Sequence, residues 1–253
     1  MILLVGNWKM APEKKTQVIA LTKATSVIAR QYKKTITTVV CPSFVHIPVA
    51  VKAANTTLSV GAQYVAPGSA VASTGLVSAA MLKDAGVQYC IVGHSENRAR
   101  GETNEMVRES VARLLEKKIR PIVCIGERDR DTQGWYLSEI KDQLEGMLVA
   151  VPRNALKQLV IAYEPVWAIG SAAVREATPQ ECREMVIFIR KILTDTYDEK
   201  AAKIVPIIYG GSANEQNANL FIAEGKAQGL LVGRVSLDPK RFALLANTIS
   251  HHE

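Results

Sequence analysis

Ile161-Ala162-Tyr163-Glu164-Pro165-Val166-Trp167-Ala168-Ile169-Gly170 joins an apolar run to a carboxylate and then to a loop that begins with proline. The residues before Glu164 have the apolar character of a strand that is buried on both faces. The residues from Pro165 to Gly170 have the composition of a lid. A carboxylate in this position can act as a general base once a lid has excluded water from it.

Two other apolar runs end in the same way. Tyr89 to Gly93 leads directly into His94, and Ile2 to Gly6 leads through Asn7 to Lys9. A carboxylate, an imidazole and an ammonium group would then follow three different strands. This pattern predicts an active site at the carboxyl ends of the strands of a parallel barrel.

The whole chain alternates between strand-like and helix-like segments. Eight apolar runs have strand length: Ile2–Gly6, Ile36–Cys41, Leu58–Gln63, Tyr89–Gly93, Pro121–Ile125, Leu159–Tyr163, Ile204–Tyr209 and Gly229–Gly233. Alternating strands and helices form parallel sheets with right-handed crossovers. Eight such units in a chain of 253 residues favour a single (β/α)8 TIM barrel. An open doubly wound sheet is the competing fold, but the first strand is not followed by its usual glycine-rich turn.

Helical spacing is clearest between Pro179 and Leu193, where apolar residues recur on one side. Thr178 and Glu181 flank its start as a capping box, with proline at the first helical position. Ser212 and Glu215 have the same spacing and predict a second capping box. A further helix is expected from Asn104 to Lys118.

Composition indicates a globular protein with a substantial aliphatic core. Apolar residues make up 48% of the chain and charged residues 22%. With no low-complexity linker or shift in composition, residues 1–253 are expected to form one domain. The 31 basic residues exceed the 24 acidic ones, which would favour a small anionic substrate. They occur as scattered pairs without interleaved aromatics, so no nucleic-acid partner is expected.

The four cysteines have neither CxxC nor metal-ligand spacing. Three of them, Cys41, Cys90 and Cys124, fall within or at the end of strand-like runs, which predicts buried free thiols and a reducing compartment. The first apolar stretch is too short for a signal peptide or a membrane span. We therefore expect a cytoplasmic protein without a membrane partner or a metal site.

Five motifs resemble the triosephosphate isomerase family and occur in that family's order: Gly6-Asn7-Trp8-Lys9-Met10, Gly93-His94-Ser95-Glu96, Ala162 to Gly170, Tyr209-Gly210-Gly211-Ser212 and Leu231-Val232-Gly233. The resemblance spans essentially the whole chain. It implies interconversion of dihydroxyacetone phosphate and D-glyceraldehyde 3-phosphate through an enediolate, a step of glycolysis and gluconeogenesis.

The resemblance also implies a role for each site residue. Glu164 would be the base that moves a proton between adjacent carbons. His94 would donate to the substrate oxygens as a neutral imidazole, a pKa-tuning arrangement for which this family is a standard worked example. Lys9 would contribute positive charge, with Asn7 as a donor beside it, and Glu96 would support the site.

The phosphate is expected on backbone N–H groups. Gly210, Gly211 and Ser212 would open a helix N-terminus, which is a natural anion site. Gly233, followed by Arg234, and Gly170 on the lid would complete this site. The chemistry implied by the resemblance requires no cofactor and no metal.

The chain departs from the family pattern in four places. Arg234 replaces a glycine, Ser171-Ala172-Ala173 replaces Thr-Gly-Lys in a lid with about two extra residues, Asn97 replaces an arginine, and Leu76 replaces a glutamate. The changes at Arg234 and in the lid motivate an alternative, an isomerase of the same family that acts on a four-carbon ketose phosphate. A non-catalytic barrel is a second alternative, but it would predict the loss of Lys9, His94 or Glu164.

Residues 65–77 form a long segment that is rich in small and apolar residues. A monomer would gain little by exposing such a segment. By resemblance, this loop inserts beside the active site of a second copy, with Thr74 near the partner copy's Asn7 and Glu96. A homodimer formed through this loop is therefore expected.

Overall fold

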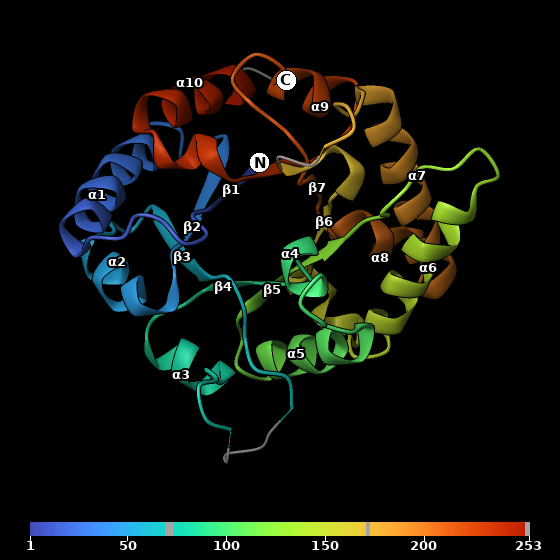
Figure 1. The fold of residues 1–253 in the computed structure, drawn as a ribbon, viewed down its shortest axis with the longest axis horizontal. Coiled ribbons are helices and arrows are strands. Elements are labelled where there is room, and N and C mark those ends of the chain that lie inside the picture. The colour runs from blue at the N-terminus through green and yellow to red at the C-terminus, as the bar shows by residue number, and fades with distance from the viewer. Residues whose placement is uncertain (69–72, 171–172, 251–253) are drawn as a thin grey trace.

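The protein is a closed parallel barrel wrapped by helices (Figure 1), seen in a computed structural model that describes residues 1–68, 73–170 and 173–250. The strands are paired in chain order, and the first strand pairs with the last: β1 (Ile2–Asn7), β2 (Ile36–Cys41), β3 (Leu58–Ala62), β4 (Tyr89–Val92), β5 (Arg120–Ile125), β6 (Val160–Tyr163), β7 (Ile207–Tyr209) and β8 (Gly229–Val232). The predicted (β/α)8 fold is confirmed.

The outer layer consists of helices that follow the strands in turn. They are α1 (Lys15–Gln31), α2 (Ile47–Ala53), α3 (Ala79–Asp84), α4 (Ser95–Arg98), α5 (Asn104–Glu116), α6 (Trp135–Leu148), α7 (Pro179–Thr196), α8 (Glu199–Ile204), α9 (Ala218–Ala223) and α10 (Pro239–Ser250). The first and last of these, α1 and α10, lie side by side and close the ring (Figure 1). None of the helices within the described ranges is both long and apolar enough to cross a bilayer.

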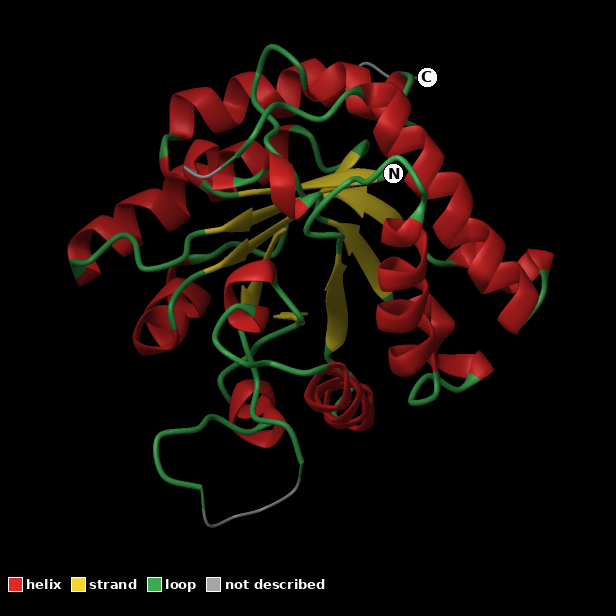
Figure 2. Cartoon of the chain, turned by 45° about the vertical axis from the view of Figure 1, so that its right-hand side comes forward, coloured by secondary structure: helices red, strands yellow, loops and turns green. Residues whose placement is uncertain are grey.

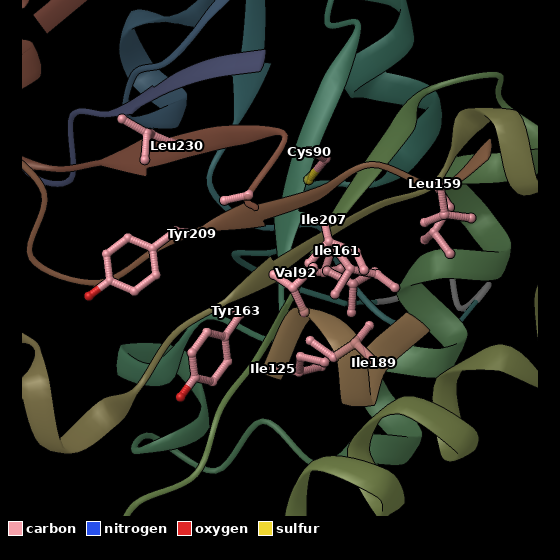
Figure 3. Close-up of a cluster of buried hydrophobic side chains, with 14 of the residues drawn as sticks. Cys90, Val92, Ile125, Leu159, Ile161, Tyr163, Ile189, Ile207, Tyr209 and Leu230 are labelled. Carbon is pink, nitrogen blue, oxygen red and sulfur yellow. The ribbon is translucent and has the colours of Figure 1, made fainter. Parts of the chain in front are cut away.

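Strand side chains are buried both inside and outside the barrel, which explains the continuous apolar runs. The interior is filled by a packed cluster: Leu3, Val5, Val39, Cys41, Tyr89, Ile91, Ile122, Cys124, Val160, Ala162, Ile208 and Leu231. Alternate side chains point outwards, and Figure 3 shows Ile125, Ile161 and Ile207 among them, close to Ile189 of α7. The barrel is therefore a solid core with its functional groups at one end.

For seven of the eight predicted strands, both ends lie within one residue of the observed ends. The strand predicted from Ile204 to Tyr209 was too long. Asp198 caps α8 by accepting a hydrogen bond from the Ala201 N–H at 2.8 Å. That helix extends to Ile204, so β7 contains only Ile207–Tyr209. The apolar run alone could not distinguish the end of a short helix from the start of a strand.

The helix predictions were correct for α7 and α5 and wrong for the second capping box. In α7, the Thr178 N–H donates to Glu181 Oε2 at 2.8 Å and the Glu181 N–H returns a bond to Thr178 Oγ1 at 3.2 Å. After β7, however, α9 begins only at Ala218. Ser212 Oγ instead donates to the Ala168 carbonyl at 2.8 Å, and Glu215 pairs with Arg241 at 2.9 Å.

Candidate active site

Glu164 follows β6 directly and is buried, with 2% of its surface exposed. Its backbone N–H donates to the Ile125 carbonyl at 2.8 Å, which fixes the main chain at the end of the strand. One carboxylate oxygen accepts a hydrogen bond from the Ser95 N–H at 3.1 Å. The other lies 3.5 Å from Nε2 of His94, so the predicted base and the predicted imidazole are neighbours.

His94 follows Gly93 at the end of β4 and caps the short helix α4. Its Nδ1 accepts a hydrogen bond from the Glu96 N–H at 3.2 Å. An imidazole nitrogen that accepts a bond carries no proton, so the proton of the neutral ring resides on Nε2, facing Glu164. In the neutral ring, the geometry thus places the Nε2–H donor next to Glu164.

Lys9 has a left-handed backbone with φ of 52°, which is uncommon for a residue with a side chain. The Asn7 side chain accepts a hydrogen bond from the Lys9 N–H at 3.1 Å. Gln63, which sequence reasoning missed, donates to the Lys9 carbonyl at 2.9 Å and to the Cys41 carbonyl at 2.8 Å. Backbone strain of this kind is retained where the surroundings enforce it, often at functional sites.

The ammonium group of Lys9 forms an ion pair with Glu96, and both side chains remain partly exposed. Burial would by itself raise the pKa of Glu96. The hydrogen bond and the charge of Lys9 outweigh that effect, so the pKa of Glu96 lies below its usual value. Glu96 is therefore ionised at neutral pH and is placed between the predicted cation and the predicted imidazole.

A cavity of about 860 Å³ opens at this end of the barrel. Four predicted site residues line it together: Asn7, Lys9, His94 and Glu96. Its wall also includes the apolar side chains of Met10 and Phe44, and Met10 is 92% exposed. Glu164 and the predicted phosphate residues Gly210 and Gly233 are not among the residues that line it.

Gly210 and Gly211 pack against residues of the site itself. A Cβ atom at position 210 would lie 2.7 Å from Glu164 Cγ, and one at position 211 would lie 2.2 Å from the Tyr209 hydroxyl. The predicted helix N-terminus does not come directly after them, because α9 begins at Ala218. The next residue, Ser212, is held against the lid by its bond to Ala168.

A helical turn does come after β8, where sequence reasoning had expected only a glycine turn. Gly233 is the N-cap of a 3-10 helix, Arg234–Leu237. The Lys9 side chain lies beside Gly233, since a Cβ atom at position 233 would lie 3.7 Å from Lys9 Cε. The Arg234 side chain is exposed. An open helix N-terminus beside a lysine is suited to an anion.

The lid begins as predicted after Glu164, with a short 3-10 helix at Val166–Ala168. Gly170 has φ of 75°, a conformation that favours glycine, and no atom of the described residues would lie within 4 Å of a Cβ added there. Ser171 and Ala172 lie outside the described residues. On the far side of the lid, Arg175 stacks 4.4 Å over the Trp167 ring and pairs with Glu181.

Glu127 is a buried carboxylate that the sequence reasoning missed. It accepts hydrogen bonds from the Tyr163 hydroxyl at 2.8 Å and from Trp167 Nε1 at 2.7 Å. Burial raises the pKa of Glu127, and these bonds oppose that effect. The residue ties the end of β6 to the start of the lid. The signal was present, since Glu127 stands after β5 as Glu164 stands after β6.

Arg98 and Glu102 hold the peptide groups of Gly93, just before His94. Arg98 Nε donates to the Gly93 carbonyl at 2.8 Å, and Glu102 Oε2 accepts the Gly93 N–H at 3.1 Å. Gly93 itself has φ of 70°, and a Cβ there would lie 2.9 Å from the Cys124 carbonyl. The turn that presents His94 is therefore fixed from both sides.

The excess positive charge of the chain does not gather at this end of the barrel. The segments that lead from strands to helices contain eight basic and ten acidic residues. The segments that lead from helices back to strands, at the opposite end, contain nine basic and three acidic residues. The expectation that the overall excess of positive charge favours an anionic substrate is thus not supported. Lys9 is the positive charge that remains at the site itself.

No group of three or more His, Cys, Asp or Glu side chains within residues 1–68, 73–170 and 173–250 is arranged to hold a metal ion. All four cysteines are free and buried, as predicted. Burial and the nearby charge of Glu164 raise the pKa of Cys124 well above its usual value, so this thiol stays neutral beside the carboxylate.

Comparison with known proteins agrees with this geometry. The sequence profile of the family described as "Triosephosphate isomerase" matches residues 2–249. A protein named "Triosephosphate isomerase" from Thermus thermophilus is 39% identical to this chain over 96% of the chain and 97% of the relative. The protein of that name from Mycoplasmoides gallisepticum is 38% identical over 96% of each. The protein of that name from Alkaliphilus oremlandii is 36% identical over 97% of the chain and 98% of the relative. The chain therefore belongs to the triosephosphate isomerase family.

Proposed function

We propose that Glu164 is the base through which this chain interconverts dihydroxyacetone phosphate and D-glyceraldehyde 3-phosphate. A carboxylate can take a proton from the carbon beside the carbonyl, leaving an enediolate, and return it to the neighbouring carbon. The observation that carries the proposal is the placement of the Glu164 carboxylate 3.5 Å from His94 Nε2 in a site shielded from water. Base and donor thereby face the same small volume.

His94 and Lys9 would stabilise the charge that develops on the substrate oxygens. The Nε2–H of His94 can donate a hydrogen bond to the oxygen that becomes part of the enediolate, and the Lys9 ammonium supplies positive charge. Asn7 supports the strained Lys9 backbone from below. Glu96 orients both partners, because it pairs with Lys9 through its side chain and with His94 through its N–H.

The phosphate would bind between the ends of β7 and β8. Backbone N–H groups of Gly210, Gly211, Ser212 and Gly233 are the donors expected there, and barrel enzymes often bind phosphate in these last two loops. The open helical turn at Gly233 and the nearby Lys9 support this assignment. Gly170 would add a further N–H from the lid.

Replacing Glu164 by glutamine tests the proposal, since the amide keeps the size of the carboxylate and removes its basicity. General bases contribute about 10² to 10⁴-fold, so kcat on glyceraldehyde 3-phosphate should fall by at least ~10²-fold while the fold is retained. The melting temperature and circular dichroism of the variant provide the control. A variant with more than about a tenth of the wild-type kcat would contradict the role of Glu164.

The four-carbon alternative gains no support from the relatives, all three of which carry the name of the triose enzyme. The non-catalytic alternative would predict the loss of Lys9, His94 or Glu164, and all three are present and assembled. Assays with a three-carbon and a four-carbon ketose phosphate, run side by side, separate the two substrates directly.

We also infer a homodimer, formed by the loop of residues 65–77. The described flanks of this loop extend away from the barrel (Figure 2), and the Ala66 N–H joins them by a bond to the Val77 carbonyl at 2.9 Å. Leu76 is 45% exposed, whereas Val65 is buried. Ala70, Val71 and Ala72 lie outside the described residues.

The cavity of about 860 Å³ provides a receptor for such a loop from a second copy. It joins the site residues Asn7 and Lys9 to the apolar side chains of Met10 and Phe44. An apolar wall next to a small polar substrate is explained if a protein segment covers it. Sedimentation at micromolar protein should show twice the 27.6 kDa chain mass, and a species of only that mass would overturn the dimer.

Two further expectations concern the chain as a whole. We infer that residues 1–253 form one barrel domain, because the sheet is closed by pairing between β1 and β8, from opposite ends of the chain. We place the protein in the cytoplasm, since four buried free thiols suit a reducing compartment. Localisation of a tagged chain in intact cells would test the second point.

A further inference from the structure

The inner face of α6 contains one polar side chain, Gln143, among buried apolar neighbours. Ile140, Leu144 and Met147 share this face, and Gln143 itself is only 6% exposed. Burying an amide is unfavourable unless its donor and its acceptor both find partners. The partners of Gln143 therefore indicate why an amide occupies this position.

Both ends of the amide bind the same residue. Gln143 Oε1 accepts the Gly126 N–H at 2.9 Å, and Gln143 Nε2 donates to the Gly126 carbonyl at 2.9 Å. Gly126 comes directly after β5, where the barrel ladder ends. Beyond the end of the ladder, no strand within the described residues supplies hydrogen-bond partners to the N–H and carbonyl of Gly126. The Gln143 side chain supplies both partners instead, from the helix layer outside the barrel.

Gly126 in turn lies against the main chain of Glu164. A Cβ atom at position 126 would be 1.7 Å from the Glu164 carbonyl oxygen, so the two backbones are in direct contact. The residues on either side of Gly126 reinforce the contact, because the Ile125 carbonyl accepts the Glu164 N–H at 2.8 Å and the Glu127 carbonyl accepts the Val166 N–H at 3.0 Å. Residues 125–127 form the surface on which Glu164 rests.

Packing alone does not hold this surface in place. A cavity of about 730 Å³ adjoins it, and the wall of that cavity includes Gly126, Gln143, Ser95 and Val166. A segment beside an unfilled space has few van der Waals contacts on that side. The two hydrogen bonds of Gln143 therefore add to the backbone bonds of Ile125 and Glu127 in keeping Gly126, and with it Glu164, in place.

We propose that Gln143 is a positioning residue for the isomerisation, acting through Gly126 on Glu164. This inference rests on the proposed role of Glu164 as the base. A displacement of a reacting group by about 1 Å can cost ~10²-fold in rate, so a distant amide that fixes its main chain affects turnover without touching the substrate.

The test is Gln143→Leu, which preserves approximate size and removes both hydrogen bonds. We expect kcat to fall by ~10 to 10²-fold. KM and the inhibition constant of inorganic phosphate should change by less than about threefold, because the phosphate donors proposed at the barrel mouth follow β7 and β8. Gln143→Glu keeps the acceptor and loses the donor, and its kcat should fall between those of the wild type and Gln143→Leu.

Leu144→Ala is the matched control, because Leu144 is equally buried on α6 and makes no bond to Gly126. It should lower the melting temperature at least as much as Gln143→Leu and leave kcat near the wild-type value. Equal losses of kcat in Leu144→Ala and Gln143→Leu would mean that general destabilisation is responsible, and would overturn the inference. If Gln143→Leu does not fold, the kcat of Gln143→Glu is compared with that of Leu144→Ala in the same way.

A double variant separates this inference from the proposed function. If Gln143 acts through Glu164, adding Gln143→Leu to Glu164→Gln should leave the residual turnover unchanged. A further fall of the same size as in the wild-type background would refute the connection. If Glu164→Gln alone retains activity, the proposed function fails. If Glu164→Gln is inactive and Gln143→Leu keeps full kcat, only the inference about Gln143 fails.

Discussion

Gly210 lies so close to Glu164 that a Cβ atom at position 210 would be 2.7 Å from the Cγ atom of the glutamate. Sequence reasoning assigned Gly210 to the phosphate alone. The structure gives it a second role, because the absence of a side chain there leaves the room that Glu164 occupies.

Gly210→Ala should therefore impair turnover by displacing the Glu164 side chain. We expect kcat to fall by ~10²-fold, the order of loss that a displacement of about 1 Å can cause. Steady-state kinetics measure it. Gly146→Ala on α6 is the control, since the nearest atom to its new methyl would be at 3.8 Å. That variant should keep kcat and gain about 0.5–1 kcal/mol of stability. An unchanged kcat in Gly210→Ala would show that Glu164 does not depend on this contact.

The neutral ring of His94 should carry its proton on Nε2. The reason is the hydrogen bond that its Nδ1 accepts from the Glu96 N–H. Nitrogen-15 NMR of histidine-labelled protein distinguishes this tautomer from the one with its proton on Nδ1, and His46→Gln assigns the signals by removing one of the others. His94→Gln should lower kcat by ~10² to 10³-fold, as for the loss of one oxyanion donor. A neutral His94 ring with its proton on Nδ1 would contradict the assignment.

Arg234 should have little effect on phosphate binding, because its side chain is exposed and the main chain provides the donors. Arg234→Gly is expected to change KM for the triose phosphate only a few-fold. A loss of about 1.5–3 kcal/mol in binding would instead indicate a direct hydrogen bond to the phosphate. Gly233→Val should raise KM strongly, since its side chain would crowd the anion site beside Lys9. Unchanged kinetics in Gly233→Val would place the phosphate elsewhere.

Asn97 and Leu76 should behave as a coupled pair, since the family pattern has arginine and glutamate at these positions. Leu76 is 45% exposed and Asn97 is half-buried, so an unpaired charge at either position costs at most about 1 kcal/mol. Asn97→Arg alone should therefore destabilise the protein, and Asn97→Arg with Leu76→Glu should recover part of the loss. Chemical denaturation of the wild type, both single variants and the double variant measures the coupling. Strict additivity would mean that the two positions do not meet.

Glu181 should stabilise the protein at neutral pH and lose that effect in acid. Its bond to Arg175 and its capping bonds to Thr178 lower its pKa from 4.5 to about 2 in the folded state, against the opposing effect of burial. Because the folded pKa is the lower one, the contribution is present above about 4.5 and disappears as the pH falls towards about 2.

Glu181→Gln measures that contribution, because glutamine retains the capping geometry without the charge. The variant should be less stable than the wild type by about 1 kcal/mol at pH 7. The difference should shrink as the pH falls through the range from 4.5 to about 2. Denaturant unfolding over this range is the measurement, and a difference that stays constant with pH would rule out the ionic contribution.

Position at a strand end was sufficient to predict Lys9, His94 and Glu164. In a parallel barrel the carboxyl ends of all strands meet at one face, so residues far apart in the sequence are brought together. The same reasoning would have found Glu127, which follows β5. The capping box of α7 was also readable, because both of its bonds lie within four residues.

Residues that act on the backbone of distant glycines could not be predicted in this way. Gln143 lies 17 residues from Gly126, and Glu102 holds Gly93 from the far side of α4. Their roles depend on the direction in which a helix presents one side chain, which spacing does not specify. The capping box predicted at Ser212 was wrong for a similar reason, since the Ser212 hydroxyl donates to the Ala168 carbonyl across the barrel mouth.

The uneven charge along the barrel axis has a practical consequence. The end opposite the active site holds nine basic and three acidic residues in its connecting segments, while the active-site end holds a slight acidic excess. On a cation-exchange support the molecule should therefore adsorb by its lysine-rich base and leave the mouth of the barrel open to the surrounding liquid. Enzyme immobilised on such beads should keep its turnover. Random covalent coupling through lysines would also modify Lys9 and inactivate some of the molecules.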